Sequence, residues 1–272
     1  MHQPARRRVT QGVLAGGLGY LTLGSGAPLV VAPGLAPDHR PPLGVGRRVH
    51  LLQLRPLARA RTVWWVNRRQ GLRPGTSMTD LAADYADALR ATFDAPVDVL
   101  GISTGGSVAL QLALDSPELV RRVVVVASGC RLGFTGKREQ RALAAEIRAG
   151  RSRAAAARVW GMGGSARASR TVLGAAGWLL GGAYFAVDQP GDVLGTLEAE
   201  DRFDVTARLG EIGLPVLVIG GDRDRIYDGG RVFVDTAEGI PGARLVVYPG
   251  KGHLGVLRSR RTVRDALAFL SA

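Results

Sequence analysis

Three residues of the chain could together perform nucleophilic chemistry. Ser103 lies in a Gly-x-Ser-x-Gly pentapeptide, residues 101–105, and His253 is the only histidine that follows it. Asp224 lies between them in the sequence. A serine hydroxyl is a weak nucleophile at neutral pH, so it needs a base that takes its proton and an acid that orients the base. The order serine, aspartate, histidine therefore predicts acyl transfer, with Ser103 as nucleophile, His253 as base and Asp224 as acid.

The flanks of the pentapeptide indicate a strand, a tight turn and a helix in that order. The apolar residues Val97, Val99 and Leu100 precede it, and the helix-like run 108–114 follows it. A strand that turns this sharply strains the serine backbone, and neighbouring glycines let the two elements pass each other. Because 38 of 272 residues are glycine, the pentapeptide alone is weak evidence. Its flanks favour a nucleophile elbow over a hydroxyl in a glycine-rich turn or at a helix N-cap.

His253 and Asp224 each follow a predicted strand. His253 comes after residues 244–248, and the loop with Asp224 comes after residues 215–219. The carboxyl ends of parallel strands meet at one edge of a sheet, which is the edge where ligands bind in open α/β sheets. We therefore expect both side chains on the same edge as Ser103.

The acid has one alternative in the same loop. Asp222 lies two residues before Asp224, and either aspartate could instead be a turn residue paired with Arg223 or Arg225. Another position for the acid would follow the valine-rich strand, but residues 128–130 read Ser-Gly-Cys and contain no carboxylate. We choose Asp224.

Strand and helix patterns alternate along the chain except in one segment. We expect a hairpin around residues 16–17, strands over 28–32, 62–66, 97–101, 122–127, 215–219 and 244–248, and helices over 51–60, 78–93, 230–238 and 257–270. The four consecutive valines within 122–127 are typical of a strand buried on both faces. Residues 137–204 are instead rich in alanine, arginine and glycine with helical periodicity. This order predicts a parallel α/β sheet interrupted once by a helical insertion.

These features together resemble the α/β-hydrolase superfamily, of the single-domain serine hydrolase type with a helical cap. In such proteins Gly-x-x-Asp follows the seventh strand and Gly-His the eighth, which match residues 221–224 and 252–253. The resemblance extends from the opening hairpin to the last helix. It implies a mostly parallel eight-stranded sheet flanked by helices, with a core of residues 1–136 and 205–272 and a cap of residues 137–204.

The implied activity is hydrolysis of a carboxylic ester or a related acyl substrate, such as a lactone or thioester, through an acyl-enzyme. An amide, a carbon–carbon bond next to a carbonyl, or a cofactor-free haloperoxidase-like reaction would use the same serine. An aspartate-nucleophile dehalogenase is disfavoured because residue 103 is serine. The alternative of another class is a non-catalytic member that uses the pocket to bind or sense a ligand.

The resemblance also implies an oxyanion hole made by the backbone N–H groups of Leu35 and Thr104. Two loops depart from the family pattern. Pro33-Gly34 stands where relatives usually have His-Gly, and residues 67–71, Asn-Arg-Arg-Gln-Gly, stand where many have Asp-x-Arg-Gly-x-Gly. The donors are backbone groups, so a proline at position 33 is compatible with an oxyanion hole.

The apolar content of the predicted cap indicates either a pocket for an apolar acyl or alcohol group of a small-molecule substrate, or only the cap's own core. The residues concerned are Trp160, Met162, Trp178, Leu179, Leu180, Tyr184 and Phe185.

The net charge of +13 is nearly all due to arginine, since Lys137 and Lys251 are the only lysines. The arginines are spread along the chain without interleaved aromatic residues, so nucleic acid is not expected as a partner. A single cysteine, Cys130, excludes internal disulfides, and four scattered histidines give no zinc-site spacing. We expect neither metal nor organic cofactor, and a reducing, cytoplasmic location. The sequence does not indicate an oligomeric state.

Two apolar stretches resemble membrane segments. Residues 9–31 contain six glycines and several polar residues, which favour a β-hairpin. Residues 171–187 are at the lower length limit of a membrane span, at about 17 residues, and contain four glycines. We expect a buried or pocket-lining helix there and no stable membrane insertion.

Overall fold

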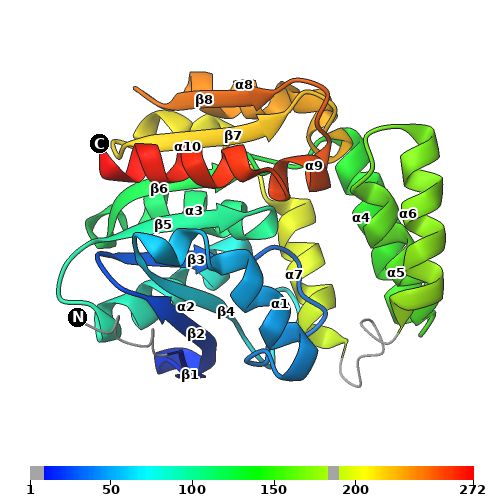
Figure 1. Cartoon of the computed structure of the whole chain (residues 1–272), viewed down its shortest axis with the longest axis horizontal. Coiled ribbons are helices and arrows are strands. Elements are labelled where there is room, and N and C mark those ends of the chain that lie inside the picture. The colour runs from blue at the N-terminus through cyan, green and yellow to red at the C-terminus, as the bar shows by residue number, and fades with distance from the viewer. Residues whose placement is uncertain (1–8, 183–189) are drawn as a thin grey trace, which may run out of the picture.

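An eight-stranded sheet flanked by helices forms the centre of the computed structural model, which describes residues 9–182 and 190–272 (Figure 1). The strands are β1 (Thr10–Val13), β2 (Leu18–Gly24), β3 (Pro28–Ala32), β4 (Thr62–Arg69), β5 (Val97–Ile102), β6 (Val120–Val126), β7 (Val216–Gly221) and β8 (Arg244–Tyr248). Their order across the sheet is β1-β2-β4-β3-β5-β6-β7-β8. The pairs β1–β2 and β2–β4 are antiparallel, and all other pairs are parallel. The predicted mostly parallel sheet is therefore confirmed.

Helices cover both faces of this sheet. They are α1 (Gly44–Leu54), α2 (Met78–Thr92), α3 (Thr104–Asp115), α4 (Phe134–Arg148), α5 (Ser152–Met162), α6 (Arg167–Leu180), α7 (Gly191–Arg202), α8 (Arg231–Gly239), α9 (His253–Leu257) and α10 (Arg260–Ser271). The apolar residues of α2, α3 and α8 pack on one face, and those of α1 and α10 pack on the other.

The valine run of β6 joins both cores. Val123 and Val125 belong to the core under α2, α3 and α8, whereas Val124 and Val126 belong to the core under α1 and α10. Successive side chains of a strand point to opposite faces, so a strand covered on both sides needs apolar residues at every position. The same requirement explains why the sequence shows an unbroken run instead of an alternating pattern.

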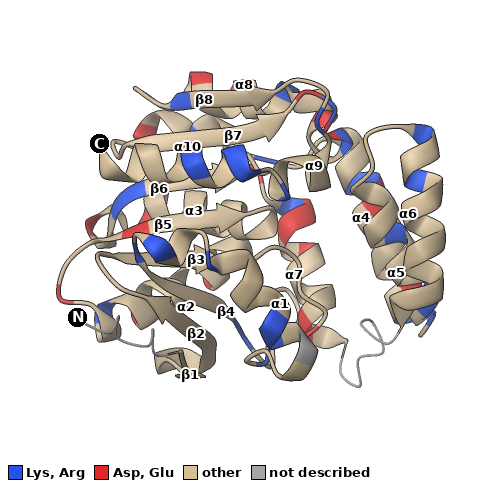
Figure 2. Ribbon diagram, viewed as in Figure 1, with Lys and Arg blue, Asp and Glu red and all other residues tan. Residues whose placement is uncertain are grey.

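Four helices, α4 to α7, stand between β6 and β7 in the sequence, and we call them the inserted helices. They lie beyond the carboxyl ends of the parallel strands, with α7 next to the core and α4, α5 and α6 farther out (Figure 1). Arginine and lysine positions are spread over both the core and the inserted helices (Figure 2). Within the described part of the chain, no helix has the length and hydropathy that a membrane span requires.

The helix expected over residues 51–60 is placed differently. It is α1, which begins at Gly44 and ends at Leu54, and a short 3-10 turn, Leu57–Arg59, follows it. Pro56 has no backbone N–H, and its ring clashes with the carbonyl four residues earlier, so it separates the two elements.

The buried helix expected over residues 171–187 is the second difference. Most of the segment belongs to α6, where Val172, Leu179 and Leu180 are 67%, 69% and 75% exposed. Only Gly177 of α6 is buried, because this helix packs closely on α5 and, among the described residues, no element covers its other side. Residues 183–187 lie outside the described residues.

Candidate active site

Ser103 occupies the turn between β5 and α3. Its backbone has φ 50° and ψ −124°, a left-handed conformation that is unfavourable for a residue with a Cβ. A Cβ on Gly101 would collide with the backbone of Gly105, and one on Gly105 would collide with the backbone of Ala32. These two glycines let β5, α3 and the end of β3 approach closely, and this packing holds Ser103 in its strained conformation.

The structure brings Ser103, His253 and Asp224 together. His253 Nε2 lies 3.1 Å from Ser103 Oγ, and His253 Nδ1 lies 2.8 Å from Asp224 Oδ2. Because the carboxylate accepts a hydrogen bond, Nδ1 carries the proton and Nε2 is left to accept one from the serine. Asp222 points elsewhere, is exposed, and accepts a hydrogen bond of 2.6 Å from the backbone of Gly250.

Asp224 is fully buried and held at both carboxylate oxygens. Its Oδ1 accepts a hydrogen bond of 3.0 Å from the backbone N–H of Ile226, while Oδ2 faces His253. Burial by itself would lower the pKa of His253. The negative charge and hydrogen bond of Asp224, together with the charge of Glu200, outweigh this effect and raise the pKa of His253 above its usual value.

Leu35 and Thr104, the expected oxyanion donors, lie on two sides of the elbow. Neither backbone N–H has a hydrogen-bond acceptor among the described residues, and Thr104 is the first residue of α3, where N–H groups have no intrahelical partner. Gly34 lies directly against Ser103, since a Cβ built on Gly34 would be 3.3 Å from Ser103 Cβ. A side chain at position 34 would therefore crowd the nucleophile.

Arg68, which is 1% exposed, holds the loop that contains Leu35 in place. The Arg68 guanidinium donates to the carbonyl oxygens of Pro33, at 3.2 Å, and Gly34, at 2.8 Å. The carbonyl and N–H of a planar trans peptide point in opposite directions. Because the Gly34 carbonyl faces Arg68, the N–H of Leu35 points away from Arg68.

Arg68 is itself oriented by a buried histidine. His39 Nδ1 donates to the carbonyl of Arg69 at 2.8 Å, so its Nε2 accepts from Arg68 Nε at 3.2 Å and lies 3.3 Å from Thr196 Oγ1. Burial, with the charge of Arg68 as a second cause, lowers the pKa of His39 to about 3. His39 is therefore neutral, which its role as acceptor requires.

Helix α7 presents three polar residues to the core at a spacing of four. Asp192 accepts from the backbone N–H of Leu72 at 2.8 Å, Thr196 faces His39, and Glu200 faces Thr104. Residues four apart lie on the same face of a helix. One face of α7 thus contacts both loops that contain the expected oxyanion donors.

Glu200 is a second buried carboxylate beside the elbow, only 1% exposed. It accepts hydrogen bonds from Thr104 Oγ1 at 2.7 Å, Gln140 Nε2 at 2.8 Å and Ser107 Oγ at 3.5 Å. Burial raises the pKa of Glu200, and the hydrogen bonds from Thr104 and Gln140 partly oppose that rise. The cluster joins α4 and α7 to the first turn of α3.

The ring of Tyr227 packs against the ring of His253. The two rings are stacked, with centroids 6.1 Å apart and planes 16° apart, and the Tyr227 hydroxyl donates to Ser128 Oγ at 3.4 Å. Burial raises the pKa of Tyr227 well above its usual value, so the phenol is neutral. Ser128, where the sequence lacks the alternative acid, thus contributes a hydrogen-bond partner for this tyrosine.

Sequence reasoning missed Glu200, Arg68, His39 and Tyr227. The four-residue spacing of polar side chains along residues 192–200 is the one signal that could have indicated Glu200, because it marks a polar stripe on a helix. Arg68 and His39 give no such signal, since they are far apart in sequence and each stands in a loop or strand of ordinary composition.

An apolar cavity of about 570 Å³ begins at the elbow, on the side of the sheet under α1 and α10. Gly34, Leu35 and Ile102 form the part of its wall nearest to Ser103. Its apolar lining continues with Leu54, Leu57, Trp65, Leu257, Val263 and Ala266.

The apolar residues named for the predicted cap do not line this cavity where the structure describes them, namely Trp160, Met162, Trp178, Leu179 and Leu180. Trp178 is 47% exposed on α6, and Met162 lines a different pocket. Tyr184 and Phe185 lie outside the described residues.

Comparison with known proteins identifies the family. The model of the alpha/beta hydrolase family matches residues 16–266, so the chain belongs to this family and is an enzyme of the α/β-hydrolase type. Two solved structures share the fold over nearly the whole chain. A hydrolase from Pseudomonas aeruginosa PA01 has a TM-score of 0.77 at 23% identity and covers 97% of this chain and 98% of its own. The enol-lactonase from Burkholderia xenovorans LB400 has a TM-score of 0.76 at 19% identity and covers 97% of this chain and 100% of its own.

One curated relative is similar over a short segment. It is the pimeloyl-(acyl-carrier protein) methyl ester esterase of Neisseria meningitidis serogroup B / serotype 15 (strain H44/76), 51% identical over 53 residues. The matched segment covers 20% of this chain and 20% of that esterase. A match of this length does not transfer the activity of the whole relative.

Proposed function

We propose that the protein hydrolyses a carboxylic ester or a related acyl substrate, such as a lactone or thioester, with Ser103 as nucleophile. The observation that carries the proposal is the continuous series of contacts from Ser103 Oγ to His253, at 3.1 Å, and from His253 to Asp224, at 2.8 Å. This is the arrangement in which a serine is activated by a base that a buried acid orients.

In the first step His253 Nε2 takes the proton of Ser103 while Ser103 Oγ attacks the acyl carbon. The carbonyl electron pair moves to oxygen, and the N–H groups of Leu35 and Thr104 stabilise the negative charge that develops there. The tetrahedral intermediate then expels the alcohol, which takes the proton from His253, and leaves an acyl group on Ser103.

In the second step water replaces the alcohol. His253 takes a proton from the water, whose oxygen attacks the acyl carbon, and then returns the proton to Ser103 Oγ as the acid is released. Asp224 remains ionised and stabilises the imidazolium that forms twice in the cycle. The raised pKa of His253 is consistent with that stabilisation.

The apolar cavity of about 570 Å³ is the proposed binding site for the acyl or alcohol group of a small-molecule substrate. Its wall includes both the loop of Leu35 and the residue before Ser103, so a chain bound there would present its carbonyl to the elbow. The inserted helices would act as a cap, residues 137–204, over a core of residues 1–136 and 205–272.

The first test is covalent labelling. Treatment with a fluorophosphonate, followed by intact-mass measurement, should add one label to the wild type and none to Ser103→Ala or His253→Ala. Loss of a triad member normally lowers the reaction rate by several orders of magnitude, so the wild type and the two variants should differ clearly. Labelling of Ser103→Ala at the wild-type level, or full esterase turnover by that variant, would overturn the proposal.

The acyl site is tested with a change that fills the cavity. Leu54→Trp should lower the ratio of p-nitrophenyl octanoate to p-nitrophenyl acetate hydrolysis, because the longer chain needs the space that the indole occupies. Leu52→Trp, on the exposed face of the same helix, is the matched control. An unchanged ratio in folded Leu54→Trp would place the acyl chain elsewhere.

A further inference from the structure

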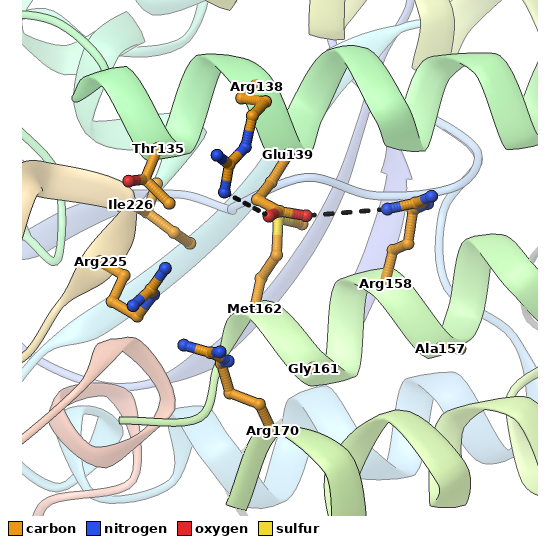
Figure 3. Close-up of a pocket in the computed structure, with 10 residues that line it drawn as sticks. All are labelled: Thr135, Arg138, Glu139, Ala157, Arg158, Gly161, Met162, Arg170, Arg225 and Ile226. Atoms are coloured by element: carbon orange, nitrogen blue, oxygen red, sulfur yellow. Dashed lines mark hydrogen bonds and ion pairs between the residues drawn. The ribbon is translucent and has the colours of Figure 1, made fainter. Parts of the chain in front are cut away.

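A second pocket, distinct from the apolar cavity, lies among the inserted helices. It has a volume of about 330 Å³ and is bounded by α4, α5, α6 and the 3-10 segment that follows Asp224, Arg225–Gly230. Four arginines line it, one from each of these elements: Arg138, Arg158, Arg170 and Arg225 (Figure 3). Apart from Glu139, the other lining residues are uncharged.

The positive charge of the pocket is only partly balanced. Glu139 is the one carboxylate in the described lining, and it pairs with Arg138 at 3.4 Å and with Arg158 at 3.8 Å. Arg158 also pairs with Glu146 at 3.1 Å, outside the pocket. Within residues 9–182 and 190–272, no ion pair or side-chain hydrogen bond involves the guanidinium of Arg170 or Arg225.

Arg170 and Arg225 approach the same space from different elements. Figure 3 shows the Arg170 guanidinium rising from α6 and the Arg225 guanidinium extending from the opposite wall. Guanidinium groups that face one cavity repel each other unless an anion lies between them, and each can hold a carboxylate or phosphate through two parallel N–H donors. We propose that this pocket binds an oxyanion, in the form of a carboxylate or phosphate group.

The pocket shares its wall with the proposed triad. Arg225 directly follows Asp224, and Ile226, which also lines the pocket, donates its backbone N–H to the Asp224 carboxylate. On the opposite side Gly163, next to the lining residue Met162, lies in contact with the side chain of Leu254, which follows His253. The pocket is therefore lined by the residue that follows the acid, and its opposite wall reaches the residue that follows the base through Gly163.

Because the pocket lies beside the proposed triad, its expected ligand is the anionic end of a substrate molecule. This extension rests on the proposed hydrolase function. The protein would then prefer esters that carry a carboxylate or phosphate at a distance from the bond that is cleaved. A free inorganic anion is the other source of the same chemistry, and the two are separated by a binding and a kinetic measurement.

Binding is measured by calorimetric titration of the full-length protein with inorganic phosphate. Arg170→Gln, Arg225→Gln and the double variant remove the unpaired guanidiniums, and each single change should weaken binding about tenfold or more, because charge-assisted hydrogen bonds are lost. Arg167→Gln on α6 and Arg223→Gln in the loop after β7 are matched controls, since both side chains are exposed outside the pocket lining. The controls should bind phosphate as the wild type does.

The kinetic measurement compares the hexanoate ester of 4-hydroxybutanoate with butyl hexanoate, two esters with the same acyl chain whose alcohol groups differ in a terminal carboxylate. In the double variant kcat/KM should fall about tenfold or more for the charged ester only. The neutral ester shows whether the change beside Asp224 has disturbed the reaction itself. Fluorophosphonate labelling of Ser103 in each variant tests the proposed function separately.

Three results are decisive. A selective loss on the charged ester identifies the substrate's own anionic group as the occupant, whether or not phosphate binds. Phosphate binding that depends on Arg170 and Arg225, with unchanged ester selectivity, identifies a free anion. If neither phosphate affinity nor ester selectivity differs between the double variant and the wild type, the oxyanion site is wrong, even if Ser103 is labelled normally.

Discussion

The ends of the core strands and the inserted helices contribute to the site in different ways. Ser103 directly follows β5, and Asp224 and His253 come in the loops after β7 and β8, so the sheet itself places them at one edge. Of the inserted helices, α7 contacts the loops beside Ser103, through Thr196 and Glu200. Helix α6 instead packs on α5 and exposes its apolar side chains.

This contrast suggests that functional importance decreases with distance from the strand ends. In the proposed mechanism the core supplies the groups that exchange protons, α7 and its partners supply the groups that hold the expected oxyanion donors, and the outer face of α6 supplies neither. Substitutions in the three regions should therefore affect turnover in that order.

The largest effect is expected in the core, for Asp224→Asn. An amide in place of the carboxylate no longer fixes the proton on His253 Nδ1, so we expect kcat on a neutral ester to fall by about 10³-fold to 10⁴-fold. Asp222→Asn is the control in the same loop, because Asp222 bonds the backbone of Gly250 instead. A loss of kcat in Asp222→Asn with kcat preserved in Asp224→Asn would show that the acid has been assigned to the wrong aspartate.

Arg68→Met should have the next largest effect. The substitution removes the donors to the carbonyls of Pro33 and Gly34 and frees the peptide that contains the N–H of Leu35. Unsatisfied buried carbonyls cost about 1–3 kcal/mol each, so kcat should fall roughly 10-fold to 100-fold.

The comparison of kcat with KM distinguishes a positioning role for Arg68 from general loss of structure. A looser oxyanion loop affects the transition state, so KM should change little. Arg68→Lys retains a charge but not the fork of donors, and should be intermediate. A loss that appears only in KM, with kcat preserved, would contradict the proposed role.

Glu200→Gln tests the contribution of α7 through pH dependence. The charge of Glu200 helps to raise the pKa of His253, so its removal should lower that pKa. The base acts in its neutral form, and kcat/KM rises with pH through the pKa of the free enzyme's base. The acid limb of the profile should therefore move to lower pH, with only a few-fold change in the plateau, because the new amide oxygen still accepts from Thr104.

Glu198→Gln is the control for this shift. Glu198 lies on the same helix but is 40% exposed and pairs with Arg148. Its removal should leave the acid limb in place. A limb that moves equally in both variants, or to higher pH in Glu200→Gln, would mean that Glu200 does not act on His253.

The sheet and the positions of the proposed triad could be predicted because their signals are local. The valine run of β6 indicates burial on both faces, and the glycines around Ser103 mark a turn that the packing of β3 and α3 requires. Asp224 and His253 follow apolar strands within a few residues. In each case a short stretch of sequence contains both the element and the residue that it positions.

The supporting residues could not be predicted, because their roles arise from contacts between distant segments. Glu200 meets Thr104 across 96 positions, and Arg68 meets His39 across 29. The exposure of Leu180 also has a nonlocal cause. An apolar helix is buried only where another element covers it, and in the described part of the chain α5 covers one side of α6 while the other side is exposed. Hydrophobic periodicity describes a helix but does not show how many partners it has.

The smallest effect is expected on that outer face of α6. Trp178→Ala and Leu180→Ser alter side chains that are 47% and 75% exposed, and surface changes of this kind usually alter stability by less than about 0.5 kcal/mol. We expect kcat/KM for neutral esters and the Tm to remain at wild-type values, because neither residue lines the apolar cavity or contacts the groups around Ser103. A tenfold loss of kcat/KM in either variant would contradict the order core, α7, α6, and would make the exposed face of α6 part of the substrate site.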